Sequence, residues 1–214
     1  MTDRKEGNAG RRGRPSLARA AAIERAILSA AGDLFLREGF DLVTMENIAA
    51  AAALSKTTLY SRYPSKESLL DAVIRDRIAQ WSSIASKRDH MMPDDMNGRM
   101  RHHACTIART ARLPEVQAFI RLIQGNGERF PHLLQAMHEA GYLYIVDFVR
   151  RDMEATAARE GRPLRDADDL ARHFVSAISG WMLQESAGGE ISEARADAAA
   201  LRCAELLLAA RDVW

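Results

Sequence analysis

The stretch from Leu54 to Lys66 reads L-S-K-T-T-L-Y-S-R-Y-P-S-K, and it decides how the rest of the chain is interpreted. Between Ser55 and Pro64 there is room for barely two helical turns, and isolated helices that short are marginal in water. Leu59 is the single aliphatic residue there, among hydroxyls, two tyrosines, a lysine and an arginine. A helix with so little to bury is expected to present its other faces to a partner.

The helical period fixes which residues those faces carry. When Leu59 faces inward and each residue advances the helix by about 100°, Thr57 and Ser61 point almost directly away from the core. Thr58 and Tyr60 flank them on opposite sides. One leucine would then anchor the helix, and its polar side would remain free.

A second short helix is expected directly before this one. Thr44 can cap its first turn, and Val43 and Ile48 stand at the two positions of a hydrophobic staple. A tight turn at Ala53 leads to Ser55, which can cap the next helix. Two short helices joined by a tight turn, the second polar outward, match a helix-turn-helix, whose second helix can enter the DNA major groove.

Each exposed side chain of the motif then has a possible role at DNA. Lysine can reach a phosphate or a guanine edge, threonine can bond to bases or touch a thymine methyl group, and tyrosine hydroxyls can reach the backbone. The predicted DNA contacts are Thr44, Lys56, Thr57, Thr58, Tyr60, Ser61, Tyr63 and Lys66. On spacing alone, a merely capped helical corner remains the alternative.

Positive charge is concentrated before the motif. Residues 1–19 hold six basic and two acidic residues, residues 20–66 balance five against five, and the remainder holds 19 basic and 22 acidic residues. Arginine-rich arms can enter a narrow minor groove. We therefore predict that Arg11, Arg12 and Arg14, in the run G-R-R-G-R-P, bind DNA there. A solubilising tail is the alternative on charge alone.

The remaining sequence predicts an all-α fold. Ile23, Ile27, Ala30 and Leu34 form one apolar stripe, which Gly39 ends as a left-handed residue. We expect about nine helices, three in a small head, a fourth joining the head to a larger body, and the others in the body. The body helices are expected near 97–111, 114–126, 131–159, 166–187 and 193–212.

Composition narrows the function class. Hydrophobic residues make up 47% of the chain and charged residues 28%, which suits a packed domain. No apolar run approaches membrane-spanning length, no secretory signal is visible, and two cysteines suggest a reducing cytoplasm. We find no nucleophile elbow, phosphate loop or metal-ligand spacing, so we expect no enzyme activity, cofactor or metal. His102, His103 and Cys105 lack the i, i+4 spacing that a helical metal site needs.

The run T-M-E-N-I-A-A-A-A-A-L-S-K-T-T-L-Y-S-R-Y-P-S-K-E-S-L-L, from Thr44 to Leu70, resembles the signature of the TetR family of bacterial transcriptional regulators. The preceding A-G-D-L-F-L-R-E-G-F-D-L-V fits that family's first helix. The resemblance implies a three-helix DNA-reading head, an all-helical ligand-binding body and a homodimer formed mainly by the last two helices. It assigns DNA contact to Thr44, Lys56, Thr57, Thr58, Tyr60, Tyr63 and Lys66.

Three positions depart from the commonest pattern of the family. Ala53 stands where glycine is frequent in the turn, Thr57 where glycine is frequent, and Ser61 where histidine is frequent. Alanine costs roughly 1 kcal/mol or more in a left-handed conformation, so we expect this turn to keep a negative φ. The other two changes leave the motif intact and remove any basis for guessing the DNA sequence.

Residues 113–141 resemble the AefR-like branch of the family's C-terminal domains, where the effector usually sits among the middle helices. The residues expected to line such a cavity are Trp81, His103, Ile107, Phe119, Ile123, Met137, Tyr142, Phe148 and Trp181. A largely apolar hollow with a few polar groups is the usual form of a small-molecule site. Ordinary core packing remains the alternative for each of these residues.

The last two helices look too apolar to lie alone on a surface. Packing them against their symmetry mates would form a four-helix interface, for which we predict Phe174, Ile178, Met182, Leu201 and Leu208. Two heads would then meet DNA about one turn, roughly 34 Å, apart. The alternative is that these helices bury their apolar faces within one subunit.

Together these features predict a basic arm at 1–15, a DNA-binding domain at 16–66 and an effector-binding and dimerisation domain at 67–214. The function expected is a ligand-responsive transcriptional regulator in the cytoplasm, associated with the nucleoid. We expect a repressor that a small apolar or aromatic molecule releases from a partly palindromic double-stranded operator. The alternative is an effector-insensitive DNA-binding or architectural dimer.

Overall fold

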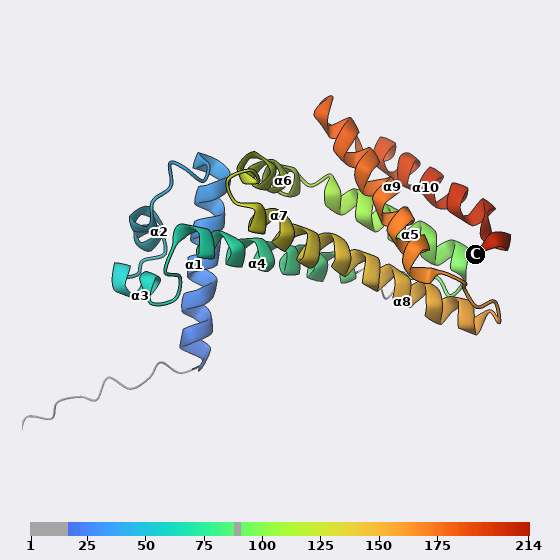
Figure 1. The fold of residues 1–214 in the computed structure, drawn as a ribbon, viewed down its shortest axis with the longest axis horizontal. Coiled ribbons are helices and arrows are strands. Elements are labelled where there is room, and N and C mark those ends of the chain that lie inside the picture. The colour runs from blue at the N-terminus through green and yellow to red at the C-terminus, as the bar shows by residue number, and fades with distance from the viewer. Residues whose placement is uncertain (1–16, 88–90) are drawn as a thin grey trace, which may run out of the picture.

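The computed structural model describes residues 17–87 and 91–214, and every regular element in those two ranges is helical (Figure 1). The head at one end consists of α1 (Leu17–Glu38), α2 (Met45–Ala51) and α3 (Lys56–Tyr60). The fourth helix, α4 (Lys66–Ser86), begins in the head and runs into the body (Figure 1). The predicted all-α class is confirmed for the described part of the chain.

The body holds the other helices. They are α5 (Met96–Ala111), α6 (Pro114–Asn126), α7 (Pro131–Met137), a π-helical segment (His138–Leu143), α8 (Tyr144–Arg159), α9 (Ala167–Ala187), α10 (Glu193–Ala209) and a final 3₁₀ turn (Arg211–Val213). The helix predicted over 131–159 is one uninterrupted helical run, but its middle is π-helical. In the described ranges, no helix combines the length and apolar character needed to cross a membrane.

The predicted helix starts are confirmed at three places in and beside the head. The Thr44 side chain accepts from the backbone of Asn47, whose side chain accepts from the Thr44 backbone in return. Ser55 caps α3, and Ser65 caps α4. Each hydroxyl accepts a hydrogen bond from an amide that the helix itself leaves without a partner. These caps let two helices as short as α2 and α3 begin at defined residues.

Helix α1 ends as predicted. Gly39 has a φ of 83°, a left-handed conformation that glycine adopts without steric cost, and its N–H donates to the carbonyl of Phe35 at 3.0 Å. The next residue, Phe40, folds back so that its ring centroid lies 5.6 Å from that of Phe35. The chain therefore reverses toward α2 with an aromatic ring placed under the end of α1.

The turn between α2 and α3 departs from the prediction, because Ala53 adopts a left-handed backbone with a φ of 54°. The N–H of Leu54 donates to the carbonyl of Ala49 at 2.9 Å, and that of Ala53 to the carbonyl of Ala50 at 3.1 Å. This pair of bonds is a Schellman helix end, which requires a left-handed residue at that position. The expectation of a negative φ was wrong, since these bonds outweigh the roughly 1 kcal/mol that alanine costs there.

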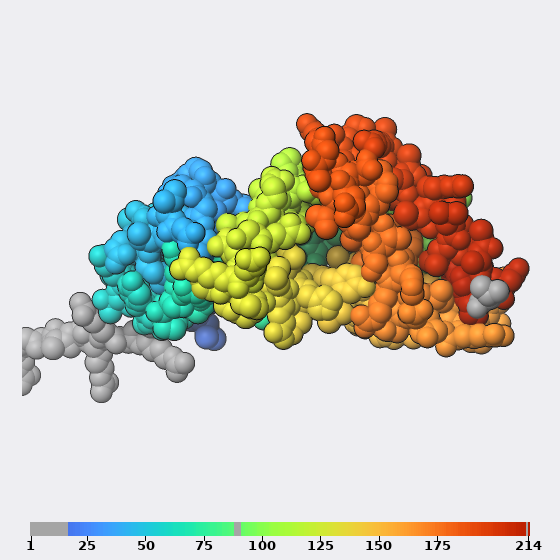
Figure 2. Space-filling view, turned by 45° about the horizontal axis from the view of Figure 1, so that its top comes forward, coloured from blue at the N-terminus to red at the C-terminus, as the bar shows by residue number. Residues whose placement is uncertain are grey.

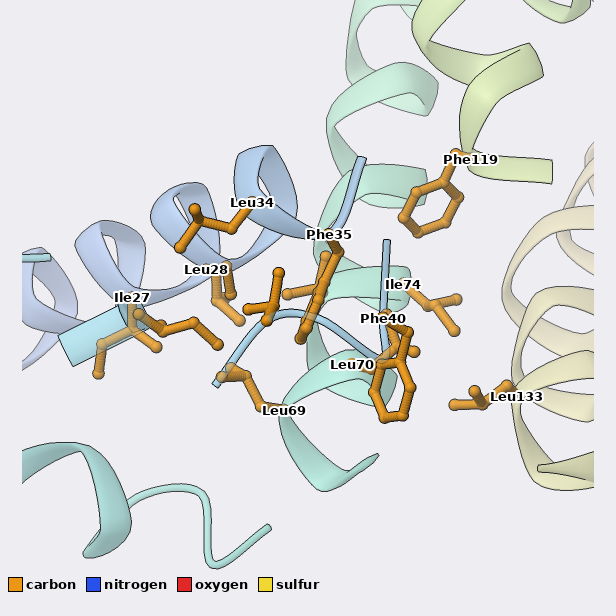
Figure 3. Packing of buried hydrophobic residues seen from close by; sticks show 14 of the residues in the cluster. Ile27, Leu28, Leu34, Phe35, Phe40, Leu69, Leu70, Ile74, Phe119 and Leu133 are labelled. Carbon is orange, nitrogen blue, oxygen red and sulfur yellow. The ribbon is translucent and has the colours of Figure 1, made fainter. Parts of the chain in front are cut away.

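Two hydrophobic clusters fill the molecule. The head-side cluster joins α1, α2 and α3 to one side of α4 and to α6 and α7. Figure 3 shows Phe40 beside Leu70 of α4, with Leu133 of α7 beyond it and Phe119 of α6 nearby. Hydrophobic packing therefore crosses the domain boundary predicted between residues 66 and 67.

The distal cluster lies among α5, α8, α9 and α10. Its buried side chains are rich in methionine and alanine: Met96, Met100, Ala104, Ala108, Met153, Ala157, Ala171, Met182, Ala196, Ala200 and Ala204. Small alanines let helices approach closely, and α10 packs along α5. This cluster forms the half of the body that lies away from the head.

Two contacts hold the loop between α1 and α2 against the body. Nη1 of Arg129 lies 2.7 Å from Oδ1 of Asp41. The ring of Phe130 meets that of Phe40 edge-on at 5.2 Å between centroids. Both body residues lie in the loop before α7, so this loop contacts the head directly, in addition to the connection through α4.

Candidate nucleic-acid interface

Helix α3 is held by the one residue that the sequence singles out. Leu59 is fully buried and is the only buried residue of α3. Thr57 and Ser61 are exposed, and 43% of Tyr60 is accessible. The side of α3 opposite Leu59 is therefore polar and open to solvent, as the helical period predicts.

Hydroxyl groups on this helix bind one another and the backbone. Oγ of Ser55 lies 2.8 Å from Oγ1 of Thr58, and it also accepts from the Thr58 N–H at 3.2 Å. The Ser61 hydroxyl donates to the carbonyl of Thr58 at 2.9 Å. Thr57 has no such bond among those described, so its hydroxyl is available to a partner beyond the protein.

An ion pair joins the starts of α2 and α3 on this surface. Nζ of Lys56, at the start of α3, lies 3.2 Å from Oε1 of Glu46 in the first turn of α2. Both side chains are largely exposed. A hydrogen bond from its own backbone N–H, and then Lys56, lower the pKa of Glu46, so this carboxylate is ionised at neutral pH. Glu46 is not among the contacts predicted from the sequence, because nothing in the spacing shows that α2 and α3 place it beside Lys56.

Two predicted contacts have partners inside the protein. Tyr63 is half-buried against the head-side cluster. Burial is the main cause that raises the pKa of its hydroxyl, and the negative charge of nearby Glu24 is the second. Lys66 donates to the carbonyls of Phe40 at 2.7 Å and Val43 at 2.8 Å.

Lys66 also lies 3.3 Å from the carbonyl of Asp41, and its Nζ is 4.4 Å from the ring centroid of Phe40. All three ammonium hydrogens are therefore directed at the loop between α1 and α2. In the free protein, Lys66 therefore fastens this loop to the start of α4. A phosphate contact by Lys66 would have to replace these hydrogen bonds, and that contact stays a prediction.

The Thr44 side chain also has a hydrogen-bond partner within the protein. Its hydroxyl accepts from the N–H of Asn47 at 3.1 Å and lies 2.5 Å from the Asn47 side-chain oxygen. A phosphate contact by Thr44 would have to share this cap. Arg11, Arg12 and Arg14 lie outside the described residues.

The residues predicted to line an effector cavity do not form one group. Trp81, Phe119, Ile123 and Met137 belong to or pack against the head-side cluster, whereas Ile107, Tyr142 and Trp181 pack against the distal cluster. The Trp81 ring N–H donates to Glu115 at 2.9 Å, and its ring meets Phe119 edge-on. The Tyr142 hydroxyl lies 2.9 Å from that of Ser176.

At the edge of the distal cluster, His103 packs against Phe148 and belongs to a polar network with Arg99 and Asp152. The buried His103 ring lies edge-on to Phe148, and its Nε2 is 2.8 Å from Oδ2 of Asp152. Arg99 binds the same carboxylate through Nε at 2.8 Å and through Nη2. Burial alone would raise the pKa of Asp152, but the hydrogen bonds from His103 and Arg99 outweigh burial and hold it far below its ordinary value.

Part of this network is already indicated by the sequence. Arg99 and His103 stand four residues apart on one helix, so both point the same way. A shared acidic partner was therefore foreseeable, although its identity was not. Within the described ranges, no group of three or more His, Cys, Asp or Glu residues is arranged to hold a metal ion.

A surface groove of about 420 Å³ lies on the head. It runs between α1 and the end of α2 and is lined by Ala26, Ser29, Ala30, Asp33, Leu34, Arg37, Ala51, Ala52 and Ala53. None of these residues belongs to the predicted effector cavity. Its floor is mostly alanine, with Asp33 and Arg37 as its charged side chains.

The predicted dimer residues on α9 require a correction. Phe174, Ile178 and Met182 are almost fully buried within the subunit, because they face the distal cluster. On the outward side, Leu183 of α9 is 42% accessible and Leu206 of α10 is 60% accessible. Leu201 and Leu208 are half-buried. Figure 2 shows that α9 and α10 form the surface at the end of the molecule opposite the head.

Comparison with known proteins places this geometry in context. Residues 27–73, which cover α2, α3 and parts of α1 and α4, match the family described as bacterial regulatory proteins, tetR family. The HTH-type transcriptional regulator YdeS of Bacillus subtilis, itself described as uncharacterized, is 37% identical over 102 residues, which is 46% of either chain. The chain therefore spans less than half the length of that relative.

Similarity to solved structures extends over most of the chain. A TetR-family transcriptional regulator from Mesorhizobium loti superposes with a TM-score of 0.80 at 25% identity, over 89% of this chain and 97% of that one. The flavonoid-responsive regulator FrrA gives a TM-score of 0.71 at 26% identity, with the same coverage of both chains. The likeness therefore includes the body as well as the head.

Proposed function

We propose that this chain, which belongs to the TetR family of bacterial regulatory proteins, binds a double-stranded operator and represses transcription until a small molecule releases it. Its relatives are transcriptional regulators and not enzymes. The observation that carries the proposal is the construction of α3, in which one buried leucine supports an outward face of hydroxyls, a tyrosine and a lysine. Such a face suits base edges in the major groove.

Selection of duplexes from a randomised pool tests operator binding. Purified protein is expected to enrich a partly palindromic sequence, and fluorescence anisotropy should show tighter binding to it than to a scrambled duplex. Thr57→Asp places a negative charge on the exposed side of α3 and should abolish the preference, because the carboxylate would face the bases and phosphates.

A matched variant controls for the added charge. Ser83 is exposed on α4 outside the head, so Ser83→Asp adds the same charge without touching α3. This variant should bind the selected duplex as the unmodified protein does. Equal loss in both variants, or no enrichment of any duplex, would contradict operator binding through α3.

The second part of the proposal is a response to an apolar or aromatic effector in the body. The structural relative FrrA is described as flavonoid-responsive, so flavonoids are the first compounds to test. The methionine-rich distal cluster supports this idea, because unbranched, polarizable side chains can repack around a ligand. An effector acts only if it binds the DNA-free conformation more tightly than the DNA-bound one.

Two measurements test the effector response together. An effector should raise the melting temperature of the free protein, since it binds the native state, and should release a labelled operator in anisotropy titrations. A compound that stabilises the protein without releasing DNA is a ligand but not an inducer. A reporter gene behind the operator then distinguishes repression from activation.

An effector-insensitive DNA-binding dimer remains the second candidate. The observation that favours it is the division of the predicted lining residues between two packed clusters. This candidate predicts that flavonoids and a wider compound library leave both the melting temperature and operator binding unchanged.

We also propose a homodimer through the outward faces of α9 and α10. Leu183 and Leu206 are exposed apolar residues there, and a second copy would remove them from water. Sedimentation should show a dimer that Leu206→Glu dissociates. Leu17→Glu, at an even more exposed leucine at the start of α1, is the matched control and should stay dimeric. Monomeric unmodified protein would contradict the dimer.

A further inference from the structure

The ion pair between α2 and α3 introduces a charge of the wrong sign for DNA. Glu46 is the only carboxylate between Thr44 and Lys66, and it lies beside the helix proposed to enter the groove. A fixed negative charge at that place repels phosphates whatever the DNA sequence. That repulsion lowers the affinity for every duplex alike and cannot distinguish one sequence from another. Any contribution of Glu46 to specificity must therefore act through its partner, Lys56.

We propose that Glu46 is a specificity-determining residue, which holds the ammonium group of Lys56 beside α3 so that this lysine reads base edges instead of binding the nearest phosphate. The proposal rests on the DNA binding proposed above. It assigns a role to a residue of α2, whereas the contacts predicted from the sequence lie on the N-terminal arm, at the cap of α2, on α3 and after α3.

The chemistry of lysine makes such a restraint useful. An ammonium group on a flexible four-carbon chain is a point charge with three donors, and it binds phosphates without regard to sequence. The 3.2 Å contact directs one donor at the carboxylate and leaves two for other acceptors. Guanine offers two acceptors on its major-groove edge, which two remaining donors can meet.

The position of the pair supports this assignment. Lys56 is the first residue of α3, one residue before the exposed Thr57, so its side chain lies next to the face proposed to meet bases. Glu46 is supplied by α2 and not by α3 itself, and α2 is fixed by the buried side chains of Met45, Ile48 and Ala49. The carboxylate is thus anchored on a separate helix, from which it can hold the lysine at a defined place.

Glu46→Gln tests the proposal by removing the charge and keeping the shape. Anisotropy titrations over a range of salt concentrations would compare the selected operator with a scrambled duplex. Freed lysine gains a phosphate contact, so affinity for scrambled DNA should rise about fivefold to tenfold at 0.1 M salt and its salt slope should steepen by about one. Operator affinity should change by less than about twofold, and the specificity ratio should fall accordingly.

A double-mutant cycle separates restraint of Lys56 from simple charge repulsion. In a Lys56→Met background, adding Glu46→Gln should change the specificity ratio by less than about twofold, because no lysine remains to be freed and relief of repulsion acts on both duplexes alike. Glu38→Gln makes the same charge change at the exposed Arg37–Glu38 pair at the end of α1. This control should leave the specificity ratio as it is.

Each outcome bears on the proposal. A fall in the specificity ratio that requires Lys56 supports it. An equal rise in affinity for both duplexes, or an effect that persists in the Lys56→Met background, overturns it in favour of plain repulsion. An unchanged ratio also overturns it. If the unmodified protein prefers no duplex, the proposed function itself fails, and that result is distinct from all of these.

Discussion

The two hydrophobic clusters are built from different kinds of side chain. The head-side cluster consists largely of branched aliphatic and aromatic residues, including Ile27, Phe35, Ile48, Leu59 and Ile74, all fully buried. The distal cluster relies on methionine and alanine, with a buried charged network at its edge. Branched and aromatic side chains have few rotamers and hold one arrangement, whereas methionine adapts to several. The contrast suits the proposed function, in which the head presents α3 rigidly and the body accommodates an effector.

The strongest test of this contrast is Phe35→Ala in the head-side cluster. The ring is fully buried and packs against Phe40 under the end of α1. Its loss should cost about 4 kcal/mol, because rigid neighbours cannot fill the space. Urea denaturation followed by circular dichroism would measure the cost. A loss below about 1 kcal/mol would mean that the head repacks freely and the contrast fails.

Asp152→Asn probes the charged edge of the distal cluster. It leaves the mostly buried Arg99 side chain without its carboxylate, which should cost about 3 kcal/mol at neutral pH. The pKa of Asp152 is lowered in the folded protein, so its contribution is present above the unfolded pKa of about 4 and is lost as the pH falls toward the folded value.

The stability difference between Asp152→Asn and the unmodified protein should therefore be constant from pH 8 to about pH 5 and should narrow below about pH 4. Denaturation at several pH values would measure it. A difference that grows on acidification would show that the carboxylate is not stabilised by Arg99 and His103.

Ala53→Gly should produce a smaller effect of opposite sign. The residue has a φ of 54°, and glycine accepts this conformation without strain. We expect a gain of about 0.5 kcal/mol, because relief of roughly 1 kcal/mol of strain is partly offset by the greater freedom of glycine in the unfolded chain. The melting temperature of the full chain would report this gain. Destabilisation would show that alanine is not strained there.

The smallest effect is expected for Met153→Leu in the distal cluster. This nearly volume-conserving change should cost less than about 1 kcal/mol, since its methionine and alanine neighbours can adjust. The same denaturation assay applies. A cost approaching that of Phe35→Ala would show that the distal cluster is as rigid as the head-side cluster, and the comparison would lose its basis.

Local signals in the sequence were sufficient for the helices and for the outward face of α3. Capping hydroxyls, Gly39 and the 3.6-residue period act between neighbours in the chain, so their spacing already contains the information. The left-handed Ala53 was missed because the hydrogen bonds that end α2 decide its conformation, and the residue type argues against it.

Contacts between residues far apart in the chain could not be predicted from spacing in the sequence. Helix α9 has apolar residues on more than one side, and the sequence does not reveal that Phe174, Ile178 and Met182 face inward. Lys66 starts a helix, which fits a phosphate ligand equally well; its carbonyl partners lie more than twenty residues away and converge only in the folded chain.

The fastening of Lys66 has a consequence for chemical reactivity. A primary amine attacks acylating reagents through its nitrogen, and the Lys66 nitrogen stays engaged with the carbonyls of Phe40 and Val43 until those hydrogen bonds open. Lys66 should thus be acylated slowly, at a rate set by how often the loop between α1 and α2 detaches, whereas Lys56, exposed and held by a single ion pair, should react faster. Mass spectrometry would follow acylation of the two residues over time, and the rate at Lys66 would report how often the loop between α1 and α2 opens.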